Sequence, residues 1–170
     1  MASKRSVRMS NKRIKLRQQR WPEITDEDLW IRDDTAGFTS IPRGISLIMR
    51  IMDALSPKKP LSNTYTTLWC YSWDEMFITI QKPRQMALES GFTGQRAEYT
   101  WLARMKKLEE LGFIRSVEGA SGRFHYVLIL NPYHIVKNLH EDEKHDVPAI
   151  LYNTLIDRID EIGETTIMID

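Results

Sequence analysis

The sequence predicts an α+β fold that is mostly helical. Apolar residues recur at helical spacing in several segments between residues 41 and 162, which predicts amphipathic helices packed around one core. Residues 113–130 instead combine apolar runs with a glycine-containing loop, which is typical of a β-hairpin. The chain has 170 residues, of which 42% are hydrophobic and 28% charged, so it is long enough for one such domain with charged tails.

The charges are divided unevenly along the chain. Residues 1–20 hold eight Lys or Arg and no acid, residues 21–140 are neutral, and residues 141–170 hold nine acids and two bases. A basic arm is attracted to nucleic acid, an anionic membrane surface or an acidic partner, although the two tails can equally pair with one another or keep the protein soluble. The basic residues of the arm are Lys4, Arg5, Arg8, Lys12, Arg13, Lys15, Arg17 and Arg20.

This charge pattern divides the chain into four expected segments. Blocks of like charge are usually mobile and often mark interaction arms, so residues 1–20 are expected to be a disordered basic arm. An acidic, irregular lead-in at 21–40 follows, then a folded domain at 41–139. Residues 140–170 are expected to form an acidic linker and an amphipathic helix.

The first part of the domain is expected to contain one helix and one less regular stretch. Ser40 is a candidate N-cap and Pro42 suits a first helical turn, which predicts a helix over 43–55. Residues 64–73 are β-branched and aromatic, which predicts a strand or a buried irregular segment. Residues 74–80 fit a short helix and a strand equally well.

A pair of helices follows, separated by a glycine turn. Pro83 marks the start of the first helix and Gly91 its end, and the second helix is expected to start near Thr93 or Gly94 and to run to Leu111. On a helical wheel, one set of second-helix side chains faces the core and another faces away from it. The core set is Trp101, Leu102, Met105, Leu108 and Leu111, and the outer set is Gln95, Arg96, Tyr99, Ala103 and Lys106.

The C-terminal part is predicted to contain a hairpin and two helices. The hairpin strands are expected at 113–117 and 123–130, and a short helix at 133–140 follows. The apolar content of this region suggests that the sheet is covered on both faces. The last helix, 149–162, has an apolar stripe that is expected to fold back onto its own domain, to pair in a homodimer or to dock on a protein partner. The stripe is Leu151, Leu155, Ile159 and Ile162.

This order of elements resembles the winged-helix domain, a form of the helix-turn-helix fold. The resemblance lies in "RQMALESGF" (first helix and turn), "TGQRAEYTWLARMKKLEELGFI" (second helix) and "EGASGRFHYVLILNP" (hairpin), and it covers about residues 41–135. It implies that the second helix enters the major groove and that the hairpin forms a wing. The "L..LE.LGFI" ending and the hairpin are similar to those of bacterial transcription regulators and plasmid replication initiators.

The resemblance implies a duplex DNA partner. Gln95, Arg96 and Tyr99 are then expected to contact bases or the groove, because Arg can bind guanine and Gln adenine through paired hydrogen bonds. The duplex is expected to be positioned by Arg84, Lys106 and Arg123, while the basic arm adds phosphate affinity. A second hypothesis is a protein-interaction module in which the winged helix and the acidic C-terminal helix bind a protein. A third is RNA binding by the arm.

The sequence shows none of the patterns expected of an enzyme or a metal protein. It has one cysteine and four histidines without metal-ligand spacing, and neither a phosphate-binding loop nor a nucleophile elbow. We therefore expect no catalytic residue, cofactor or metal. No apolar run approaches the roughly 20 residues of a membrane span, so a cytoplasmic location is expected. The resemblance implies that the protein is a bacterial DNA-binding protein.

Overall fold

The computed structural model describes residues 4–163, and the chain divides into two compact units, Met1–Phe38 and Thr39–Asp170. The first unit contains helix α1 (Lys4–Arg20) and two single 3₁₀ turns, η1 (Asp26–Asp28) and η2 (Arg32–Asp34).

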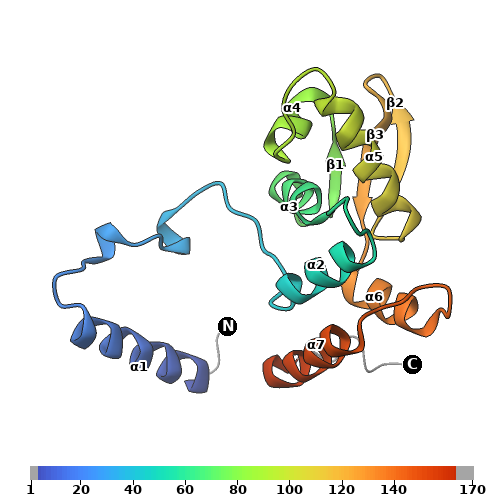
Figure 1. Cartoon of the computed structure of the whole chain (residues 1–170). Coiled ribbons are helices and arrows are strands. Elements are labelled where there is room, and N and C mark those ends of the chain that lie inside the picture. The colour runs from blue at the N-terminus through green and yellow to red at the C-terminus, as the bar shows by residue number, and fades with distance from the viewer. Residues whose placement is uncertain (1–3, 164–170) are drawn as a thin grey trace. The chain divides into compact units, whose positions relative to one another are not determined.

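Helix α1 differs from the disorder predicted for the basic arm (Figure 1). Its sequence is rich in Lys, Arg and Gln and has no Gly or Pro between Lys4 and Arg20, so local helix propensity is high. The Arg17 guanidinium also pairs with the Asp26 carboxylate at 2.5 Å, which ties the end of α1 to the acidic segment after it. From Val7 onward the side chains are exposed or half-buried, so the helix has no buried face of its own.

The second unit confirms the mostly helical α+β fold. It combines helices with a three-stranded antiparallel sheet, whose hairpin is followed by two helices (Figure 1). The elements are α2 (Ile45–Ala54), α3 (Ser62–Tyr71), β1 (Phe77–Thr79), α4 (Pro83–Glu89), α5 (Ala97–Glu110), β2 (Ile114–Gly119), β3 (Gly122–Ile129), α6 (Pro132–Glu141) and α7 (Ala149–Ile162).

Helix α3 contradicts the strand or irregular segment predicted for residues 64–73. Tyr65, Leu68 and Trp69 are buried at helical spacing, and this burial outweighs the β-propensity of the segment. The Asp53 carboxylate accepts the backbone N–H groups of Leu61 and Ser62 at 2.6 and 2.9 Å and so satisfies donors at the start of α3.

The start of α2 also differs from the prediction. Gly44, and not Ser40, occupies its N-cap position, and α2 begins at Ile45. The Gly44 N–H donates to the buried Tyr133 hydroxyl at 3.1 Å, so a residue of α6 satisfies this donor.

The sheet has the strand order β1-β3-β2, with both pairs antiparallel. Residues 74–80, which fitted a helix or a strand, contain β1. Ile78 pairs with Val127 in β3, and Ser116 of β2 pairs with Val127 from the other side. The hairpin β2–β3 therefore lies close to its predicted position.

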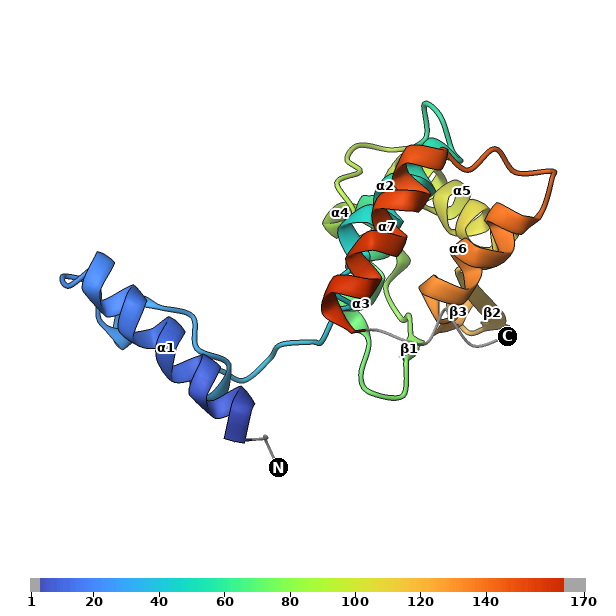
Figure 2. The ribbon, with the colours of Figure 1, turned by 90° about the horizontal axis from the view of Figure 1, so that it is seen from below.

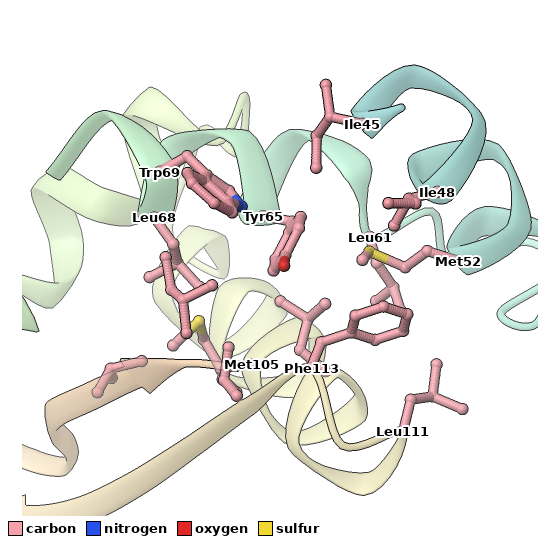
Figure 3. Packing of buried hydrophobic residues seen from close by; sticks show 14 of the residues in the cluster. Ile45, Ile48, Met52, Leu61, Tyr65, Leu68, Trp69, Met105, Leu111 and Phe113 are labelled. Carbon is pink, nitrogen blue, oxygen red and sulfur yellow. The ribbon is translucent and has the colours of Figure 1, made fainter. Parts of the chain in front are cut away.

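The main core lies between α2, α3, α5 and the sheet (Figure 3). Tyr65 of α3 meets Phe113, which precedes β2, edge to face with ring centroids 5.7 Å apart. Trp101 of α5 has no exposed surface and meets Phe124 of β3 at 6.3 Å. These aromatic contacts hold the inner side of α5 against the sheet.

Helix α7 packs against α2, as Figure 2 shows from below. Leu155 and Ile159 have no exposed surface, and Leu151 and Ile162 are half-buried. The apolar stripe thus folds back onto its own domain, which was one of the three expectations. Leu155 and Ile159 are not accessible to a homodimer or a protein partner in this arrangement.

Candidate nucleic-acid interface

Helices α4 and α5 are joined by a turn that requires glycine at two positions. Gly91 and Gly94 have φ of 87° and 81°, in the left-handed region that favours glycine. After this turn, α5 buries the face that the wheel predicted. Ala97, Trp101, Met105 and Leu108 are its buried residues, and Leu102 is half-buried.

Helix α5 begins at Ala97, and not near Thr93 or Gly94 as predicted, so Gln95 and Arg96 lie in the turn before it and Tyr99 lies in its first turn. Gln95, Arg96 and Tyr99 are all exposed, with Tyr99 66% exposed. The Arg96 guanidinium carbon lies 5.3 Å from the centroid of the Tyr99 ring, so these two side chains form one surface. The N-terminal end of a recognition helix is the part that usually contacts base edges.

A basic groove runs beside the outer face of α5. Its charged lining residues include Lys59 from the turn after α2, Lys106 and Lys107 from α5, and the acidic Glu110, also from α5. Lys59 and Lys106 are exposed, whereas Lys107 lies 3.6 Å from Glu110. Lys106 is thus accessible, as a phosphate contact requires.

Lys59 is not among the basic residues that the sequence predicts for this surface. The only signal in the sequence is the pair Lys58 and Lys59 between two prolines, just after the helix predicted over 43–55. Lys58 has φ of 66°, so the turn is tight there. Their nearness to α5 depends on the fold and not on local sequence.

Arg104, also beside this groove, has a structural role. Its Nε donates to the Pro60 carbonyl at 3.1 Å, and its guanidinium lies over the Phe92 ring at 5.5 Å. Burial lowers the pKa of Arg104. These contacts connect α5 to the chain before α3.

Arg123, expected to touch DNA from the wing, is engaged in an ion pair instead. Its guanidinium donates to the Glu109 carboxylate of α5 at 2.8 Å. Glu109 also accepts the Ser116 backbone N–H at 2.9 Å and the Ser116 hydroxyl at 2.5 Å. The ion pair and these hydrogen bonds fix the hairpin onto α5, so a DNA contact by Arg123 would compete with Glu109.

Burial and hydrogen bonding shift the pKa of Glu109 in opposite directions. Partial burial raises it, but the hydrogen bonds from the Ser116 hydroxyl and from Arg123 outweigh this effect and lower the pKa. The folded state thus prefers the charged carboxylate. Its contribution to stability is present above the pKa of the unfolded chain and is lost as the pH falls through the lower folded pKa.

We expect Glu109→Gln to lower the free energy of unfolding by about 1 kcal/mol at pH 7. The difference from wild type should narrow as the pH falls through the lowered folded pKa of Glu109, where the wild-type carboxylate also becomes neutral. Urea unfolding of both proteins at pH 7 and at pH 3 measures this difference in the free energy of unfolding. Glu110→Gln is the matched control, because that side chain is 50% exposed and its ion pair with Lys107 is long, at 3.6 Å. A penalty of equal size at pH 7 and pH 3 would contradict the electrostatic explanation.

Arg84 lies apart from these cations, in the first turn of α4. It is exposed and lines a second groove between α4 and the start of α5, together with Leu88 and Phe92. Leu88 is 61% exposed, so this groove is partly apolar. Arg84 is therefore accessible, as a phosphate contact requires.

The outer face of the sheet is exposed, which contradicts the prediction that both faces are covered. Phe77, Val117, Tyr126 and Leu128 lie on this face and are 44%, 65%, 39% and 43% exposed. The rings of Phe77 and Tyr126 stack with centroids 5.9 Å apart. The C-terminal helix covers α2 and leaves this face open.

Residues 4–163 contain neither a candidate metal-ion cluster nor a candidate membrane-spanning helix. No cluster of three His, Cys, Asp or Glu side chains that could hold a metal ion occurs among these residues. None of the described helices is long and apolar enough to cross a membrane.

Comparisons with protein families, with curated proteins and with solved structures gave no match to this chain.

Proposed function

We propose that residues 41–139 form a winged-helix domain that binds duplex DNA through α5. The biological role would be transcription control or replication initiation on a mobile element, in the cytoplasm of a bacterium. The order of α4, the glycine turn, α5 and the β2–β3 hairpin supports this proposal, because it is the order that the family resemblance requires.

The observation that supports it most is the exposed start of α5. Gln95 and Arg96 immediately before α5 and Tyr99 in its first turn lie at the end that base recognition uses, and all three are exposed. The basic groove with Lys59 and Lys106 lies farther along the same helix. In this proposal the first group reads base edges and the second binds phosphate.

The test is binding of the full-length protein to duplex DNA across a salt series, followed by Arg96→Ala. Affinity is expected to fall steeply with salt as counterions are released. Once a preferred site has been selected, Arg96→Ala should weaken binding to it by about 1–3 kcal/mol and relax its specificity. Arg158→Ala on the acidic helix α7 is the control, since Arg158 pairs with Glu161 at 2.8 Å. No binding to duplex DNA at low salt would overturn the proposal.

A second candidate function is protein binding, and the open face of the sheet favours it. Phe77, Val117, Tyr126 and Leu128 form a contiguous apolar surface, a type of surface that often marks an interaction site. Leu128→Lys separates the two candidates, because it should leave DNA affinity unchanged and abolish binding of a protein to this face.

A further inference from the structure

The two edge strands of the sheet, β1 and β2, differ in how their outward backbone groups are hydrogen-bonded. The strand order leaves one side of β1 and one side of β2 without a neighbouring strand. On the β2 side, the Glu109 carboxylate accepts the Ser116 N–H at 2.9 Å, so a side chain of α5 occupies that edge. Strand β1 has no corresponding acidic side chain along its edge among the contacts of the described residues.

The backbone of β1 presents hydrogen-bonding groups to its open side. The Ile80 N–H donates to the His125 carbonyl at 2.7 Å, and the Met76 carbonyl accepts from the Ile129 N–H at 3.0 Å. Because alternate residues of a strand direct these groups to opposite sides, those of Phe77 and Thr79 point away from β3. Both residues are exposed.

Apart from its short length of three residues, the edge lacks the usual protection against pairing. Natural edge strands are commonly blocked by a charged side chain, a proline or a bulge. Strand β1 has the sequence Phe77, Ile78, Thr79, with no charge and no proline. An uncharged edge with unpaired backbone groups is a site for addition of another strand.

We propose that β1 pairs with β1 of a second copy of this chain, antiparallel and about a two-fold axis at Ile78. This register places Phe77 opposite Thr79 of the second copy. These are the residues whose backbone groups point outward, so each such pair can exchange both N–H···O=C bonds. The two sheets then join into one continuous sheet.

The charges that flank β1 identify the second copy as the occupant. Asp74 and Glu75 precede the strand, and Lys82 and Arg84 follow it, all four exposed. Antiparallel pairing places the acidic end of one β1 beside the basic end of the other, so attraction occurs at both ends of the interface. Parallel pairing would instead bring like charges together, which is unfavourable.

The dimer has a consequence for DNA that rests on the proposed function. A two-fold axis relates the two α5 helices, so the preferred site would be an inverted repeat. Self-association itself does not depend on DNA. A dimer that binds no DNA would therefore overturn the proposed function alone, and a DNA-binding monomer would overturn the dimer alone.

The first experiment is sedimentation velocity on the full-length protein over a concentration series, without DNA. We expect a reversible dimer. Thr79→Pro removes the outward N–H at an edge position that tolerates proline, and it should weaken self-association at least about tenfold. Thr79→Val keeps the N–H and should dimerise like the wild type. Circular dichroism checks that each variant is folded.

A charge exchange provides a test that does not depend on proline. Asp74→Lys with Glu75→Lys should weaken the dimer, and adding Lys82→Glu should restore it. All three side chains are exposed, so folding should be unaffected. A protein that stays monomeric up to about 100 μM would overturn the proposal. So would a dimer that Thr79→Pro leaves intact and Leu128→Lys abolishes, because the interface would then be the sheet face.

Discussion

Replacing Trp101 with alanine is expected to bring the folded domain close to unfolding. Trp101 has no exposed surface and lies between α5 and the sheet, with its ring 6.3 Å from that of Phe124. Truncation of a buried Trp typically costs about 3–5 kcal/mol, because apolar contacts are lost and a cavity remains. Domains of this size have a total stability of about 5–15 kcal/mol. Thermal unfolding should show a decrease of roughly 10–20 °C in Tm.

Two other substitutions show whether this cost arises from lost core contacts. The Trp101 indole N–H is buried and has no hydrogen-bond partner in the described structure, so Trp101→Phe loses no hydrogen bond and should cost about 1–2 kcal/mol. Trp73→Ala should cost less than about 0.5 kcal/mol, since Trp73 is 77% exposed. Equal losses of stability in Trp101→Ala and Trp73→Ala would show that α5 does not pack against the sheet through Trp101 as described.

The helix pair and the hairpin could be predicted because their signals are local. Trp101, Met105 and Leu108 repeat at helical spacing, and the structure buries all three. Gly91 and Gly112 end the two helices where the sequence placed the turns, each with positive φ. Local periodicity and turn chemistry therefore determine α4, α5 and the hairpin together.

Helix α3 could not be predicted, because its signal is tertiary. Its β-branched and aromatic residues favour a strand by propensity, but Tyr65 and Leu68 are buried against residues distant in sequence. The start of the helix depends on the Asp53 carboxylate, which lies eight residues before Leu61. A single-sequence pattern contains neither contact.

The electrostatic partners of the candidate interface also could not be predicted, because they are distant from one another in sequence. Arg123 pairs with Glu109 across a separation of 14 residues, and Lys59 and Lys106 line one groove only because the turn after α2 lies beside α5. The sequence identified which side chains are basic and exposed. It did not show which of them are already neutralised within the domain.

Removal of residues 1–20 is expected to cause the largest loss of DNA affinity. The arm contains eight basic residues and no acid. A protein that neutralises Z phosphates of a duplex shows a log–log salt slope of about −0.9Z. Full engagement of the arm would therefore contribute about 7 to the slope, and its removal should weaken binding at low salt by at least about 100-fold. Fluorescence anisotropy with random-sequence duplex measures both quantities.

The helical form of the arm provides the matched control. Residues four apart, such as Arg8 and Lys12, repel each other along α1 and destabilise the free helix by about 0.2–0.5 kcal/mol per pair. Duplex phosphates would relieve this repulsion. A variant with all eight bases changed to Gln keeps the length and helix propensity of the arm and should behave like the deletion, whereas replacing every Arg with Lys should preserve the salt slope. An unchanged slope in the Gln variant would show that the arm does not contact the backbone, and tighter binding of wild type to single-stranded RNA than to the duplex would assign the arm to RNA.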